Sequence, residues 1–150
     1  MIVVERSVRL DAPPDRVFRY ITDLGSFPEW QVTAGITRAR TVDGGPLAKG
    51  SDFRMERSSR GRTATIHCSV IGFEPDRRFS FTTKDDDGFT GDVDTRLTPD
   101  GDGTRLDWTL RMRPPGAWRL LSPVIKREIA KAADADFATL RSRLATQAPA

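Results

Sequence analysis

Apolar residues recur every three or four positions through residues 122–144. They stand at Ile125, Ile129, Ala133, Phe137, Leu140 and Leu144. This spacing places them on one side of an α-helix, whose other side carries most of the charged residues. Ser122 followed by Pro123 predicts the N-cap and the first helical position. At about 1.5 Å per residue such a helix is roughly 35 Å long, which is enough to cross a whole sheet.

Alternation of apolar and polar residues predicts strands over most of the remaining chain. The predicted strands are residues 2–12, 35–42, 52–56, 62–73, 79–82, 89–98 and 104–112. Sequences rich in Gly, Pro and Asp separate them, such as residues 43–46 and 99–103. Gly72 interrupts the fourth strand and predicts a bulge that returns Phe73 to the inner face. Clean alternation over successive strands favours an antiparallel sheet with one face toward water.

Two short helices are predicted between the first and second strands. Pro14 opens the first, and Val17, Phe18 and Ile21 form its apolar face. The second is a single turn over residues 27–30. The chain of 150 residues contains no internal repeat and no linker, so we expect one domain spanning residues 1–150. The order of strand, two short helices, six strands and long helix predicts the α+β class.

Charge and cysteine content narrow the function classes. The 24 Lys and Arg residues are interleaved with 21 Asp and Glu residues, and aromatic residues do not alternate with the basic ones, which argues against nucleic-acid binding. Cys68 is the single cysteine, so an internal disulfide and a Cys-rich zinc site are excluded. The apolar start is too short for a signal peptide, and no run of 18 apolar residues predicts an integral membrane segment. We therefore expect a cytoplasmic protein.

Few residues offer catalytic chemistry. His67 is the only histidine, and its parity places it on the outer face of the fourth strand. A Ser-His-Asp or Cys-His mechanism therefore has no evident base. The acidic residues 85–87 belong to a turn beside strands and do not match a calcium loop. No glycine-rich loop matches a phosphate-binding pattern. The sequence therefore predicts no metal site and no cofactor, and it identifies no catalytic residue.

The predicted inner face carries a group of large side chains, namely Phe53, Met55, Phe81 and Trp108. Such residues either fill a core or line a pocket for a flat apolar ligand, and the pattern leaves both possibilities open. Arg6 and Arg57 interrupt the series of apolar residues that is predicted to face inward. A buried guanidinium needs an acceptor, and Asp136 or a polar group of a ligand could provide one, unless Arg57 lies at a solvent-exposed mouth.

Several short motifs resemble the SRPBCC (START-like) superfamily, and the polyketide cyclase/dehydrase-like bacterial proteins are the nearest group. These motifs are VRLDAPPDRVF (residues 8–18), FPEW (27–30), VIGFEP (70–75), RFSF (78–81), GTRL (103–106) and residues 137–144. The resemblance implies a helix-grip (Bet v 1-like) fold, in which a curved antiparallel sheet of seven strands and two short helices surround the long C-terminal helix. Because the family includes carriers, receptors and enzymes, the fold alone does not choose among functions.

The resemblance implies that a small hydrophobic or aromatic ligand binds in a cavity between the C-terminal helix and the sheet. The expected ligand-binding residues are Trp30, Phe53, Met55, Arg57, Phe81, Trp108, Ile125 and Ile129. A polyketide cyclase or dehydratase, with an arginine polarising a carbonyl, is the first alternative. A protein-interaction or stress-related module without a ligand is the second. The oligomeric state does not follow from the sequence.

Overall fold

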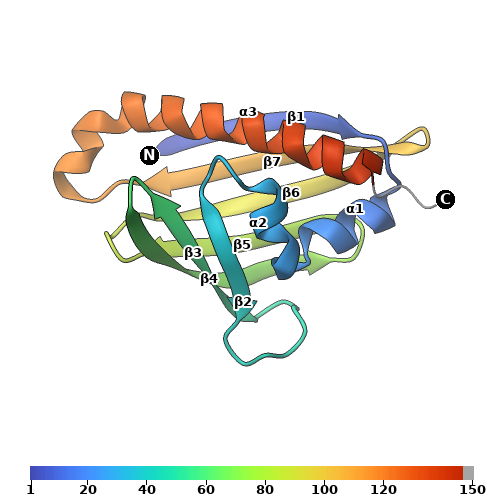
Figure 1. The fold of residues 1–150 in the computed structure, drawn as a ribbon, viewed down its shortest axis with the longest axis horizontal. Coiled ribbons are helices and arrows are strands. Elements are labelled where there is room, and N and C mark those ends of the chain that lie inside the picture. Colours follow the sequence, from blue (N-terminus) through green and yellow to red (C-terminus); the bar gives the residue numbers. More distant parts are fainter. Residues whose placement is uncertain (147–150) are drawn as a thin grey trace.

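In residues 1–146, seven strands, separated by turns or short helices, form one antiparallel sheet (Figure 1). The computed structural model describes the backbone of residues 1–146. The strands in this part are β1 (Ile2–Leu10), β2 (Ile36–Thr41), β3 (Asp52–Ser59), β4 (Arg62–Glu74), β5 (Arg78–Asp85), β6 (Thr90–Asp100) and β7 (Gly103–Arg113). Their order across the sheet is β1-β7-β6-β5-β4-β3-β2. Together with the helices this confirms the predicted helix-grip fold.

The helices cover one face of this curved sheet (Figure 1). They are α1 (Pro14–Ile21), the 3₁₀ helix η1 (Leu24–Ser26), α2 (Phe27–Trp30), the 3₁₀ helix η2 (Gly116–Leu121) and α3 (Ser122–Thr146). The long α3 runs beside β1, and its C-terminal end lies near α1, where the Arg16 guanidinium donates a hydrogen bond to the carbonyl oxygen of Leu144. No helix in the described part is both long and apolar enough to cross a lipid bilayer.

The apolar stripe of α3 is buried unevenly along its length. Ala133, Phe137, Leu140 and Leu144 are buried. Ile125 and Ile129, from the N-terminal half, are only half-buried. The C-terminal half of α3 therefore completes the core, and the N-terminal half does not.

The predicted N-cap role of Ser122 is wrong. The 3₁₀ helix η2 runs directly into α3, so Ser122 has helical backbone angles. Its hydroxyl donates to the carbonyl oxygen of Arg119 at 2.8 Å. An N-cap residue requires an extended backbone, which the preceding helical turn does not allow here.

The predicted bulge at Gly72 is confirmed by the strand register. Val70 lies opposite Phe81, whereas Gly72 lies opposite Ser80, so the pairing shifts by one residue between them. After the shift Phe73 pairs with Phe79 and points to the concave face. There its ring meets Phe18 of α1 edge to face, with ring centroids 5.2 Å apart.

The convex face carries a row of basic side chains across four strands. Arg40 lies opposite Arg54, Arg54 opposite His67, and His67 opposite Lys84. Neither Arg40 nor Arg54 makes an ion pair within the described residues. Like charges directly opposite one another on antiparallel strands repel.

Replacing Arg40 with glutamate is expected to raise the free energy of unfolding by about 0.5 kcal/mol, because the new carboxylate faces Arg54. Arg38 is the matched control, since it is exposed on the same strand but lies opposite Glu56. Arg38→Glu should therefore change stability in the opposite direction. Urea unfolding at low and high salt measures both effects, and high salt should reduce both. Equal effects of the two substitutions would contradict this account.

Candidate functional site

The eight expected ligand-binding residues fall into three classes of burial. Trp30, Phe53, Met55 and Phe81 are buried in the core. Trp108, Ile125 and Ile129 are half-buried, and Trp108 and Ile129 pack against that core. Arg57 is exposed at the end of β3, where it lies opposite Ile36 and Ala64. The strand residues among them share the concave face, as their parity predicted.

Aromatic rings contact one another through the middle of the concave face. Trp108 meets Phe137 edge to face at 5.3 Å, and Phe137 stacks on Trp30 at 6.0 Å. Phe27 then connects Trp30 to Phe53, with 6.3 Å between the centroids in each pair. Phe53 meets Phe81 at 5.1 Å. The buried members of the expected site are therefore packed against other side chains, and Trp30 lies within this cluster.

One polar group in this aromatic cluster lacks a partner. The indole N–H of Trp30 is buried, and it has no hydrogen-bond acceptor among the described residues. A buried donor without an acceptor costs about 1–3 kcal/mol. The N–H is therefore a place where the oxygen atom of a water or of a ligand would be stabilised.

The concave face is less covered beneath the N-terminal half of α3. We call this region the half-buried end and define it by Ile66, Trp108, Met112, Ile125 and Ile129. All five are half-buried, and four of them, Ile66, Trp108, Met112 and Ile129, pack against the core. Met112 lies opposite Gly91, which has no side chain to cover it. This end therefore offers apolar surface that is neither fully packed nor fully exposed.

Arg6 is the inward arginine beside this end, and its acceptor differs from the predicted one. It lies opposite Trp108 on the neighbouring strand. Its Nε donates to Oδ1 of Asp134 on α3 at 2.6 Å. The ion pair is partly exposed, so we expect it to contribute little to stability. It connects α3 to β1.

Asp136, the predicted acceptor for an arginine, has another role. Its carboxylate is buried and accepts hydrogen bonds from the backbone N–H groups of Thr33, at 2.7 Å, and Ala34, at 3.0 Å. Burial raises the pKa of Asp136, and the two backbone donors oppose that shift. Asp136 therefore attaches α3 to the loop that follows α2.

The two other reactive side chains, His67 and Cys68, lie on opposite faces of the sheet. His67 is exposed on the convex side, as predicted, with Nε2 3.7 Å from Oδ1 of Asp86. Cys68 is buried, and burial raises its pKa to about 12, so the thiol stays protonated and is a poor nucleophile. Among the described residues no group of His, Cys, Asp and Glu is arranged to hold a metal ion. Apolar contact is therefore the chemistry that the concave face offers.

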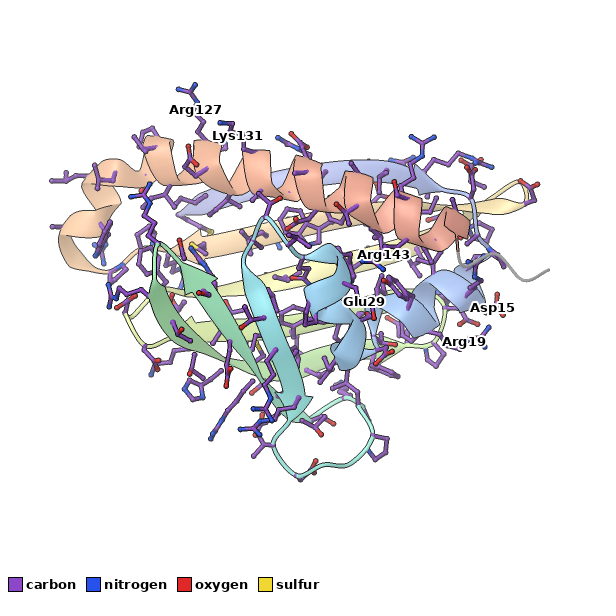
Figure 2. The ribbon with its side chains drawn as sticks, in the orientation of Figure 1. Asp15, Arg19, Glu29, Arg127, Lys131 and Arg143 are labelled. Atoms are coloured by element: carbon purple, nitrogen blue, oxygen red, sulfur yellow. The ribbon has the colours of Figure 1, made fainter. Side chains whose placement is uncertain are left out.

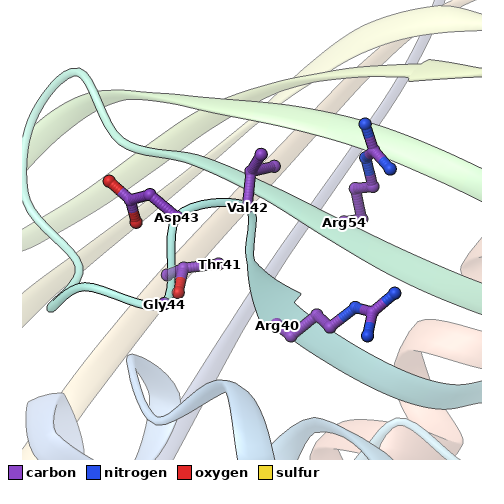
Figure 3. A pocket seen from close by; sticks show the side chains of 6 residues that line it. All are labelled: Arg40, Thr41, Val42, Asp43, Gly44 and Arg54. Carbon is purple, nitrogen blue, oxygen red and sulfur yellow. The ribbon is translucent and has the colours of Figure 1, made fainter.

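Two open pockets lie elsewhere on the surface. The first has a volume of about 350 Å³ and lies where β2 ends, between Arg40, Arg54 and the following loop with Asp43 (Figure 3). The second, of about 270 Å³, lies near Met1, Thr82 and Arg111. Neither pocket lies between α3 and the sheet, where the cavity was expected. The rings described above occupy much of that space.

Comparisons with known proteins agree with this architecture. A family model described as "Polyketide cyclase / dehydrase and lipid transport" matches residues 1–147. No curated protein matches the chain. Among solved structures, a START superfamily protein from Mycobacterium smegmatis is 18% identical with a TM-score of 0.77, covering 99% of this chain and 100% of its own.

Two further structures share the fold. TTHA0849 from Thermus thermophilus is 18% identical with a TM-score of 0.76, and the match covers 98% of this chain and 99% of that one. The protein Ara h 8.0201 is 13% identical with a TM-score of 0.75, covering 97% and 98%. At these identities the solved structures show a shared fold and nothing about a shared ligand.

Proposed function

Because the chain belongs to the polyketide cyclase/dehydrase and lipid transport family, we propose that it binds a small hydrophobic or aromatic molecule on its concave face. The ligand lies at the half-buried end, between the N-terminal half of α3 and the sheet. Trp108, Ile125 and Ile129 contact it directly. Trp30, Phe53, Met55 and Phe81 form the packed wall behind it, and Arg57 lies at its exposed edge.

The observation that carries this proposal is the uneven burial of the apolar side chains of α3 and of the concave face. The apolar side chains in the C-terminal half of α3 are buried against the sheet. Ile125 and Ile129, in contrast, are half-buried, as are Ile66, Trp108 and Met112. Burial of apolar area contributes about 25 cal/mol per Å² before ordering costs. A ligand that covers these side chains therefore gains affinity mainly from contact with apolar surface.

The unpaired N–H of Trp30 adds a chemical preference to the proposal. A ligand that reaches the aromatic cluster with a carbonyl or hydroxyl oxygen satisfies this donor. A pure hydrocarbon of the same shape leaves the N–H unsatisfied. We therefore infer a ligand that is largely apolar but carries at least one oxygen acceptor.

We expect α-tetralone, a bicyclic ketone, to bind about tenfold more tightly than tetralin, which has the same rings without the oxygen. Trp30→Phe keeps an aromatic ring and removes the donor, so it should abolish this preference. Competition titrations followed by NMR measure both affinities. Equal binding of the two probes to the unmodified protein would remove Trp30 from the proposed site.

The isoleucine methyl signals locate the bound probe within the same titration. Ile66, Ile125 and Ile129 should shift, because they belong to the half-buried end. Ile71 is the internal control, since it is exposed and lies away from the concave face. If no methyl group of the half-buried end shifts up to the solubility limit of the probe, the proposed function is wrong.

The cyclase alternative receives less support from the arrangement of side chains. Arg57 could polarise a carbonyl, but its neighbours across the strands are Ile36 and Ala64, and no carboxylate forms an ion pair with it in the described part of the chain. Aldol chemistry needs a base within hydrogen-bond reach of the proton to be removed. Ligand binding therefore stands as the primary proposal.

A further inference from the structure

An apolar surface remains uncovered where η2 leads into α3. We call it the η2 patch and define it by Trp118, Leu120, Leu121 and Val124. Their exposed fractions are 50%, 84%, 47% and 58%. Four large apolar side chains exposed within seven residues are unusual on a monomer, where single exposed apolar residues are normal. Such a patch indicates a surface that another molecule covers.

The backbone holds the η2 patch together on one end of the molecule. Side chains three residues apart align in a 3₁₀ helix, so Trp118 and Leu121 share a face. The ring of Trp118 lies 5.8 Å from the ring of Phe89, which follows the turn after β5. This contact anchors one end of η2, while Leu120 remains almost fully exposed.

The charges around the η2 patch are mainly positive. Residues 113–128 contain Arg113, Arg119, Lys126 and Arg127 and one acidic residue, Glu128, whereas the remaining chain carries 20 basic and 20 acidic residues. None of the four basic side chains makes an ion pair within the part of the chain that the structure describes. Figure 2 shows Arg127, and Lys131 one turn later, extending from α3 away from the sheet. These basic side chains are therefore exposed on the part of α3 that follows the patch.

The acidic residues in the turn before Phe89 have partners elsewhere. Asp85 accepts hydrogen bonds from the backbone N–H groups of Asp87 and Phe89. Asp86 accepts one from the N–H of Thr65, and Asp87 pairs with Arg62 on β4 at 3.2 Å. Their carboxylates therefore serve the turn and the neighbouring strand β4, and Glu128 is the one acidic residue among the four basic residues that surround the patch in the sequence.

From this combination we infer that the η2 patch docks onto a lipid bilayer that contains anionic lipids. Apolar and aromatic side chains enter the interface between headgroups and acyl chains, and the surrounding Lys and Arg side chains contact lipid phosphates. A second copy of this chain fits poorly, because a symmetric contact would bring two equally basic rims together. The patch adjoins the N-terminal half of α3, so docking would place the half-buried end close to the membrane.

Vesicle sedimentation tests this inference with two lipid compositions. The protein should bind vesicles of phosphatidylcholine mixed with phosphatidylglycerol, and it should bind phosphatidylcholine vesicles weakly. Leu120→Ser should weaken binding to the mixed vesicles about tenfold, because it removes the most exposed apolar side chain from the interface. Replacing Lys126 and Arg127 with alanine should weaken binding to the mixed vesicles and reduce its dependence on salt.

Val32→Ser is the matched control, since Val32 is 61% exposed and lies outside the η2 patch. This variant should bind the mixed vesicles as the unmodified protein does. Unchanged binding of Leu120→Ser, or equal binding to both lipid compositions, would overturn the inference. It would also fail if sedimentation velocity without lipid showed a dimer that Leu120→Ser converts to a monomer. The test contains no tetralone, so its failure leaves the proposed ligand site untouched.

Discussion

Replacing Phe137 with alanine is expected to lower the free energy of unfolding by about 3–5 kcal/mol. Its ring is buried on the stripe of α3 and lies between two tryptophans, stacked on Trp30 at 6.0 Å and edge to face with Trp108 at 5.3 Å. Removing it loses the burial of the ring, leaves a cavity and breaks both aromatic contacts. Urea unfolding followed by far-ultraviolet circular dichroism measures the loss.

Phe137→Leu separates the volume of this ring from its aromatic contacts. Leucine refills most of the space, so we expect a loss of only about 1.5 kcal/mol. If Phe137→Ala lowered the free energy of unfolding by less than Phe137→Leu does, the rings could not be packed as the structure has them. The proposed ligand would then have room in the middle of the concave face and not only at the half-buried end.

Replacing Asp136 with alanine is expected to cost about 2 kcal/mol, the second largest effect we foresee. Its carboxylate holds the backbone N–H groups of Thr33 and Ala34, and alanine leaves both donors without this acceptor. The loop after α2 then loses its attachment to α3. Urea unfolding measures the loss, and Asp134→Ala, which removes the partner of Arg6 at the surface, is the control with a smaller expected effect.

The pH dependence of Asp136 has a definite sign. Burial raises the pKa of Asp136 in the folded protein above its value of about 3.9 in an unfolded chain. Its contribution to stability is therefore fully present below that unfolded value and is lost as the pH rises through the folded pKa. This loss concerns only the proton-linked part of the contribution of Asp136, and the hydrogen bonds from Thr33 and Ala34 persist at neutral pH. The stability of the unmodified protein relative to Asp136→Asn should accordingly fall from acidic toward neutral pH.

Paired urea titrations of the unmodified protein and Asp136→Asn across that acidic range test this sign. Taking the difference between the two proteins cancels the titration of the other carboxylates. A difference that grows with pH would mean that the hydrogen bonds from Thr33 and Ala34 outweigh burial. The position of Asp136 would then stabilise the carboxylate, and its pKa in the folded protein would lie below its value in an unfolded chain.

The docking and ligand proposals concern two neighbouring features of the same region. The half-buried end is apolar surface on the concave face beneath α3, and the η2 patch is exposed apolar surface where α3 begins. Both exist because the N-terminal half of α3 lacks the close packing that Ala133 and Phe137 provide further along.

The order of elements and the facing of side chains could be read from the sequence, because both depend on local periodicity. A period of two assigned Phe53, Phe81 and Trp108 to one face, and spacings of three and four assigned Ile125 to Leu144 to one stripe. Gly72 and the outward His67 followed from the same parity. Each of these features depends on residues only a few positions apart, so it needs no knowledge of distant contacts.

Contacts between distant segments were decided only by the tertiary structure. The sequence offered Asp136 as the acceptor for an arginine, but the crossing of α3 over β1 brings Asp134 to Arg6 and leaves Asp136 facing the loop at Thr33. Inward parity likewise could not say whether Trp30, Phe137 and Trp108 would enclose a space or fill it. Periodicity fixes the direction of a side chain, whereas the distance and angle between packed elements fix what that side chain meets.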